Sequence, residues 1–194
     1  MRSTALHVMN DEHQAIAAML RSLSMLVAQS RRERKLPDFG LMRAMLFYLD
    51  EFPERLHHAK ETQLLFPLVR QRCPELRAVV ERLESDHARG EAAIRSVERA
   101  LLAFEMLGES RRDAFEEAAQ RYVGAYLHHM AVEETQLLPA AREHFTAADW
   151  VELDAAFAAN KDPLTGHAAT DEYRALFSRI VTLAPAPIGL GNPA

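Results

Sequence analysis

Cysteine, glycine and long apolar runs are scarce in this chain of 194 residues. A single cysteine, Cys73, cannot form an internal disulfide bond. The N-terminus lacks the charged start and apolar run of a signal peptide, and no stretch approaches the ~18 uninterrupted apolar residues of a membrane-spanning helix. We therefore expect a cytoplasmic protein that does not bind membranes.

Clustered positive charge is missing as well. The chain carries 23 Lys and Arg residues against 28 Asp and Glu residues, which gives a formal net charge of -5. Nucleic-acid binding depends on clustered Lys and Arg, and the short basic run at residues 31–35 is typical of the exposed last turn of a helix. We expect no nucleic-acid partner, and the sequence does not indicate a protein partner.

The abundant residues favour helices. Glycine occurs only 7 times, and Ala, Leu, Glu and Arg, which are good helix formers, dominate the chain. Apolar residues recur with helical spacing in four long segments, at about residues 4–30, 40–71, 75–107 and 111–144. Because the breaks between them are short, we predict an all-α fold, an up-down-up-down four-helix bundle. Pro53 should kink the second helix.

One or two short helices should follow the bundle. Thr146 is a candidate cap for a helix at about residues 147–160, and a second helix should cover about residues 168–183. From residue 185 onward, the chain is typical of an irregular or loosely docked tail.

Two segments of the chain repeat the same residues. Residues 56–67 read LHHAKETQLLFP, and residues 127–139 read LHHMAVEETQLLP. Aligning the final prolines of the two copies pairs His57 with His129 and Glu61 with Glu133. The adjacent histidines, His58 and His128, have no counterpart in this alignment. We interpret them as flanking residues, and the alternative in which one of them binds a metal stays open.

The apolar stripe of each predicted long helix contains one histidine, and two stripes also contain a glutamate. A buried ionised carboxylate costs several kcal/mol unless it is paired or bound to metal. A histidine and a glutamate four residues apart lie on one helix face, about 5–6 Å from each other. Inward residues of four-helix bundles build metal sites in this way. We predict a two-metal site with the ligands His13, His57, Glu61, His87, His129 and Glu133.

A ferritin-like di-iron site is the main structural alternative. Two Glu-x-x-His motifs, Glu54 to His57 and Glu84 to His87, fit it. That site also needs an inward glutamate on each remaining helix. The first helix offers His13 there, with Glu12 turned about 100° away. The mixed site uses every inward polar residue, so we prefer it.

The remaining histidines and the methionines receive no ligand role. The histidines outside the pattern should lie on the surface: His7, His144 and His167. The methionines of the apolar stripes should fill the core, as for Met19, Met42 and Met45.

The pattern resembles the hemerythrin-type cation-binding family, often called the HHE domain. Its motifs stand here as Asp11-Glu-His13, His57-His-Ala-Lys-Glu61, Asp86-His-Ala88 and His129-x-x-x-Glu133. Residues 149–164 also resemble the C-terminal extension of the bacterial branch. The resemblance implies a hemerythrin-like domain at residues 1–165, followed by a C-terminal helix and irregular tail at residues 166–194.

The resemblance also implies a cofactor. It consists of two Fe ions joined by an oxo or hydroxo bridge, with Glu61 and Glu133 as bridging carboxylates, although Zn or Mn would accept the same ligands. Oxygen-carrying hemerythrins have a second histidine one turn from the first on helix 3. Leu83 and Glu91 stand at those positions here. Either Glu91 supplies a carboxylate, or one iron has a position open to water; Tyr48 or Tyr126 as phenolate ligand is a further alternative.

Fewer imidazoles favour the ferric state, so reversible oxygen carriage is not the expected function. The resemblance implies a non-heme di-iron protein that binds, senses or reacts with O2, peroxide or NO, or that handles iron. One alternative is an enzyme with catalase-like, peroxidase-like or iron-centre repair activity. Another is a regulatory helical bundle with a structural metal. No Ser/His/Asp or Cys/His arrangement and no glycine-rich phosphate loop favours a hydrolase or a nucleotide-binding protein.

Overall fold

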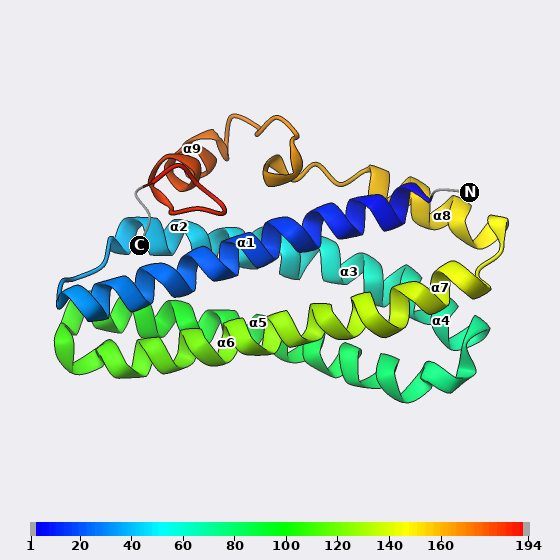
Figure 1. Cartoon of the computed structure of the whole chain (residues 1–194), viewed down its shortest axis with the longest axis horizontal. Helices are drawn as coiled ribbons and strands as arrows, with labels where there is room; N and C mark the ends of the chain where they lie inside the picture. The colour runs from blue at the N-terminus through cyan, green and yellow to red at the C-terminus, as the bar shows by residue number, and fades with distance from the viewer. Residues whose placement is uncertain (1–2, 192–194) are drawn as a thin grey trace.

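The computed structural model of the chain describes residues 3–191 and is helical, as predicted. Four long helical segments lie side by side, and the chain turns back after each of the first three (Figure 1). The first segment is α1 (Thr4–Glu33). The second is made of α2 (Phe39–Leu49), η1 (Asp50–His57), α3 (His58–Lys60), η2 (Glu61–Leu65) and α4 (Phe66–Arg72). The third is made of η3 (Pro74–Leu76) and α5 (Arg77–Leu107), and the fourth of η4 (Glu109–Arg111), α6 (Arg112–Val132), η5 (Glu133–Leu137) and α7 (Leu138–His144).

Local capping residues set the ends of these segments. The side chain of Ser3 accepts a hydrogen bond from the backbone N–H of Leu6 at the start of α1, and Asp38 does the same for Leu41 at the start of α2. Gly108 ends α5 with a φ of 77°, a conformation that L side chains rarely adopt. The turns are therefore short, and they hold neighbouring segments against each other.

Three π-helical stretches interrupt the second and fourth segments. Pro67 and Pro139 cannot donate a backbone hydrogen bond, and their rings clash with the carbonyl four residues back, so the helix widens just before each of them. The residue before each proline bonds the carbonyl five residues back: Phe66 to Glu61, and Leu138 to Glu133. Both copies of the repeated segment thus begin a π turn at the predicted glutamate ligand. The third stretch, η1, contains Pro53, where the sequence predicted a kink.

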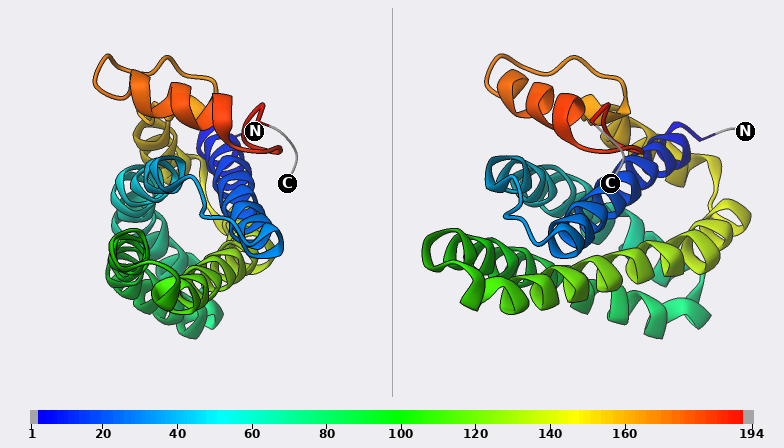
Figure 2. Two further views of the ribbon diagram at one scale, coloured as in Figure 1. Left: turned by 90° about the vertical axis from the view of Figure 1, so that its left-hand side faces the viewer. Right: turned by 60° about the vertical axis from the view of Figure 1, so that its left-hand side comes forward.

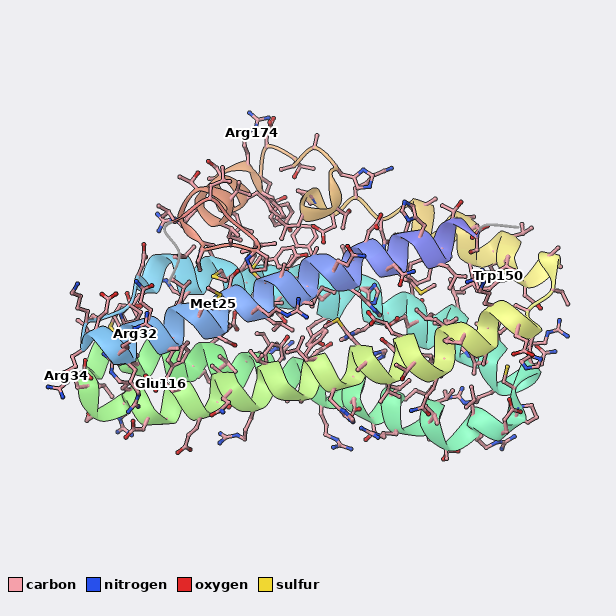
Figure 3. All side chains as sticks on the ribbon, viewed as in Figure 1. Met25, Arg32, Arg34, Glu116, Trp150 and Arg174 are labelled. Atoms are coloured by element: carbon pink, nitrogen blue, oxygen red, sulfur yellow. The ribbon has the colours of Figure 1, made fainter. Side chains whose placement is uncertain are left out.

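Two apolar clusters lie on either side of the predicted ligands. One cluster contains large buried side chains such as Tyr48, Phe104 and Phe115, together with Met19, Met42 and Met45, which confirms these methionines as core residues. The other contains Phe66, Trp150 and Phe157. Figure 3 shows Trp150 at the end of the bundle opposite to Arg34 and Glu116. The polar site therefore lies between two apolar cores along the length of the bundle.

The C-terminal part packs on the outside of the bundle. Thr146 caps α8 (Ala147–Ala158) in a capping box with Asp149, as the sequence predicted. After η6 (Pro163–Thr165) comes α9 (Arg174–Leu183), which begins later than expected because residues 168–170 have no regular structure and residues 171–173 form a turn. Figure 2 shows α9 and the tail beside α1 and α2.

The described part of the tail, residues 185–191, is irregular and docked on α1, whereas residues 192–194 lie outside the described residues. Ser22 donates a hydrogen bond from its hydroxyl to the Pro185 carbonyl at 2.9 Å, and the Ile188 N–H approaches the same hydroxyl oxygen at 3.4 Å.

Among residues 3–191, no helix combines the length and apolar character needed to cross a membrane.

Candidate metal centre

Four histidines, one from each long segment, meet in two pairs; three of them are buried, and the side chain of the fourth, His87, is 8% exposed. In the first pair, the Nε2 atoms of His13 and His57 lie 3.0 Å apart. In the second pair, the Nε2 atoms of His87 and His129 lie 2.9 Å apart. Two ligand atoms that each lie ~2.1 Å from one metal ion, at a right angle, are ~3.0 Å apart. Each pair therefore has the spacing of two imidazoles on one metal ion.

Two carboxylates lie between the pairs and face both of them. Glu61 places Oε1 3.1 Å from the Nε2 of His57 and Oε2 3.5 Å from the Nε2 of His87. Glu133 places Oε2 3.5 Å from the Nε2 of His13 and Oε1 3.2 Å from the Nε2 of His129. Each glutamate thus turns one oxygen to each pair. The fold brings all six predicted ligands together.

The four oxygens of these carboxylates have no hydrogen-bond donor. All four are buried, and none accepts a hydrogen bond from any residue between 3 and 191. Buried polar atoms are nearly always hydrogen-bonded, and an orphaned carboxylate is especially costly. Divalent cations at the two histidine pairs would satisfy all four oxygens. The donor set therefore fits two metal ions that share both carboxylates.

The pKa values of the two shared glutamates shift in opposite directions, and the pKa of His87 is lowered. Burial raises the pKa of Glu133, and the nearby Glu61 carboxylate raises it further. Burial also acts to raise the pKa of Glu61, but the positive charge of His57 outweighs it and the net shift is downward. Burial lowers the pKa of His87 to about 4. Without added positive charge, the two carboxylates compete for protons, which bound cations would relieve.

Each histidine also has a polar neighbour at its other ring nitrogen, Nδ1. The pairs are His13 with Glu134 at 3.0 Å, His57 with Glu12 at 2.7 Å, His87 with Thr62 at 2.7 Å, and His129 with Asp86 at 3.7 Å. A partner that accepts the Nδ1–H proton leaves Nε2 unprotonated and fixes the ring. Three histidines have such a hydrogen-bonding partner, whereas the Nδ1 of His129 lies too far from Asp86 for a hydrogen bond.

These partners follow one another around the bundle, and three of the four are hydrogen-bonded to their histidines. Each adjoins a predicted ligand in the sequence and serves the histidine of the next segment: Glu12 adjoins His13, Thr62 adjoins Glu61, Asp86 adjoins His87, and Glu134 adjoins Glu133. None of these four roles was predicted from the sequence. We expected Glu12 to point away from the site. It lies instead behind His57, and Glu12 is only 4% exposed. A polar residue next to each ligand was the available signal.

His58 lies beside the second pair. Its ring stacks on that of His87 with centroids 4.0 Å apart, and it belongs to one group of potential ligands with Glu61, His87 and His129. Its own ring nitrogens have other neighbours: Nδ1 lies 3.1 Å from Glu54 Oε2, and Nε2 lies 2.8 Å from the Tyr126 hydroxyl. This position fits the predicted flanking role, and ligation by His58 stays an alternative.

Several other candidates lie away from the site. Glu91 is exposed and pairs with Arg95, and the exposed His128 contacts Arg82. Glu84, needed by the ferritin-like alternative, pairs with Arg70. Tyr48 donates to Asp162. The three histidines predicted on the surface, His7, His144 and His167, are exposed.

The fold and this residue set define a helical-bundle protein of the metal-binding class. A family model described as "Hemerythrin HHE cation binding domain" matches residues 4–141. The chain belongs to this cation-binding family, which confirms the resemblance seen in the sequence. Comparisons with curated proteins and with solved structures gave no match.

Proposed function

We propose that this protein is a non-heme di-iron protein, built as an up-down-up-down bundle, that senses or reacts with O2, peroxide or NO, or handles iron. The observation that carries the proposal is the pair of shared carboxylates, Glu61 and Glu133, whose four buried oxygens have no donor among residues 3–191 and face both histidine pairs. Two iron ions would be held by His13 and His57 on one side and by His87 and His129 on the other.

Bound iron would supply electron transfer to small oxidants. The chain holds the ligands in place for it, because Glu134, Glu12 and Thr62 orient three of the four imidazoles through Nδ1. The apolar clusters on both sides exclude water from the carboxylates. On α5, the positions one turn from His87 are taken by the buried Leu83 and the exposed Glu91. This supports a site with fewer imidazoles than an oxygen carrier, which favours the ferric state.

An enzyme that consumes peroxide is the second candidate. It is favoured by a cavity that reaches the second histidine pair from the surface, since a reactant can enter there without unfolding the bundle. A structural metal in a regulatory bundle would not need such access.

The experiment that tests the proposed function is metal analysis of the purified protein, together with a near-ultraviolet and visible spectrum before and after peroxide. We expect about two iron ions per chain and a spectrum that changes with peroxide. Zinc as the bound metal, with no spectral response to peroxide, would contradict the proposal. Glu61→Ala serves as the matched control, because it should lose both the metal and the spectrum.

A further inference from the structure

A pocket with a volume of about 360 Å³ opens between α5 and α6 and ends at the second histidine pair. We call it the α5–α6 pocket. Its walls are mostly small or aromatic side chains, namely Ala93, Ala118, Ala125, Tyr122 and Tyr126. Its deep end is formed by His58, His87 and His129. A molecule in this pocket would contact the metal centre from one side only.

Among the described residues, the first histidine pair has a much smaller cavity beside it. The cavity next to His57 has a volume of about 20 Å³, room for about one water molecule. The end of α8 and the residues that follow it cover this side. Asn160 donates to Glu12 at 2.7 Å, and the Phe157 ring lies edge-on to His57 with centroids 6.2 Å apart. Of these two cavities in the described residues, the α5–α6 pocket is the one that can admit a reactant larger than water.

Arginines outnumber carboxylates among the charged residues that line the α5–α6 pocket. The side chains of Arg82 and Arg121 are 51% and 72% exposed, and each faces a carboxylate: Arg82 lies 4.0 Å from Asp86, and Arg121 lies 3.5 Å from Glu117. Arg89 has no carboxylate partner within 4.0 Å among the residues that the structure describes, and donates only to Ser85. Arginines at the mouth of a cleft attract anions and raise their local concentration.

The inner wall is built around a buried glutamate. Glu54 accepts a hydrogen bond from the Tyr122 hydroxyl at 3.0 Å and lies 3.1 Å from His58. Gly90 makes room for it, since a Cβ at that position would lie 2.5 Å from Glu54 Oε2. A glycine inside a helix is destabilising relative to alanine, so the close approach of Glu54 explains its presence. Burial raises the pKa of Glu54 to about 7, which weakens its repulsion of an anion.

We propose that the α5–α6 pocket binds a small organic molecule with an apolar body and an anionic, oxygen-bearing head, and presents that head to the His87 and His129 side of the centre. The volume is far larger than a diatomic gas or hydrogen peroxide requires, and it lies in the range of pockets that hold organic ligands. The apolar walls fit the body, and the arginines attract the charge. The delivery to metal rests on the proposed function, whereas binding in the pocket does not.

The test uses octanoate as the probe and the full chain in both iron-loaded and metal-free forms. Octanoate binding is measured by isothermal titration calorimetry. Ala125→Phe places a ring in the pocket from an exposed position on α6, one helical turn before His129. Ala28→Phe is the matched control, because Ala28 is an exposed alanine on α1 that lines a different cavity. Melting temperature and metal content verify that each variant is folded and loaded.

We expect wild type and Ala28→Phe to bind octanoate in both forms, and Ala125→Phe to bind at least tenfold more weakly. Arg89→Gln should weaken octanoate binding severalfold and leave the binding of neutral octanamide unchanged. Absence of octanoate binding to wild type, or equal binding by wild type and Ala125→Phe, would overturn the pocket assignment. If the protein carries no iron, but Ala125→Phe abolishes octanoate binding to the metal-free form, the di-iron proposal fails and the pocket proposal stands.

Discussion

The two halves of the candidate centre have nearly the same ligands and very different surroundings. Each half offers two imidazoles and one oxygen from each of Glu61 and Glu133. The half with His13 and His57 is enclosed by the end of α8 and the residues that follow it, whereas the half with His87 and His129 borders the α5–α6 pocket. Under the proposed function, we expect the enclosed half to retain metal and the open half to meet the reactant.

The second difference lies behind the imidazoles. In the enclosed half, Glu12 is buried and contacts the Nδ1 of His57 at 2.7 Å. In the open half, the Nδ1 of His129 has no hydrogen-bond partner among the described residues, and Asp86 lies 3.7 Å away with its side chain 30% exposed. A ring held by a buried carboxylate is more strongly oriented than one beside a solvated carboxylate. We infer that the enclosed half is the more rigid one.

Removing a shared carboxylate should have the largest effect, because it breaks both halves at once. We expect Glu61→Ala and Glu133→Ala to lose most of the bound metal, as measured by elemental analysis of the purified variants. The control is His128→Ala, which changes an exposed histidine outside the site and should keep full metal content. Full metal content in Glu61→Ala would show that this residue does not bridge the halves.

Removing the metal should lower the thermal stability of the protein. Metal that binds only the folded protein stabilises it by mass action, by about 3 kcal/mol at a hundredfold excess over the dissociation constant. We expect the metal-loaded protein to melt at a higher temperature than the chelated one in differential scanning calorimetry.

We also expect a chromogenic chelator to remove metal in two phases, with the ion beside the α5–α6 pocket leaving first. Ala125→Phe should slow the fast phase and leave the slow one unchanged. A single phase in wild type would mean that the two halves are equally accessible.

The pH dependence of the unfolding free energy should reveal the titration of Glu54, which lines the pocket of the open half. Its pKa rises from 4.5 to about 7 on folding, mainly because of burial, so the folded protein holds the proton more tightly. The stabilisation is therefore complete below pH 4.5, and it is lost as the pH rises through about 7. The shift corresponds to about 3 kcal/mol at most.

Urea denaturation of the metal-free protein at several pH values measures this dependence. Glu54→Gln mimics the protonated carboxyl and should remove it. The unfolding free energy of the wild type, relative to that of Glu54→Gln, should decrease as the pH rises from 4.5 to 8. A constant difference would show that Glu54 keeps an ordinary pKa in the folded protein.

A smaller effect should distinguish the partners behind the imidazoles. Loss of such a partner typically lowers metal affinity 10- to 100-fold. We expect about this loss for Glu12→Gln, and less than a threefold loss for Asp86→Asn, because only Glu12 contacts its histidine at hydrogen-bond distance. Competition with a chelator of known affinity measures both. Equal losses in the two variants would remove the distinction in rigidity between the halves.

The positions of the predicted ligands followed from local rules. Residues four apart share a helix face, so the sequence placed His57 with Glu61 and His129 with Glu133 on the same faces. The two prolines six residues after the glutamates gave the alignment, and the structure adds that each proline forces a π turn beginning at its glutamate. The start of α9 was predicted too early, because residues 168–170 have no regular structure and residues 171–173 form a turn before the helix begins.

The sequence by itself determined the helical segments, their inward faces and the family, because helix periodicity and capping depend on residues a few positions apart. Only the tertiary structure decided the Nδ1 partners, the cover over His57 and the pocket between α5 and α6. Glu12 is the clearest case. Its helix phase turns it away from the face of His13, and it is the packing of η1 against α1 that places the Nδ1 of His57 beside it. Contacts between distant segments depend on how closely two helices approach, and no local pattern encodes that distance.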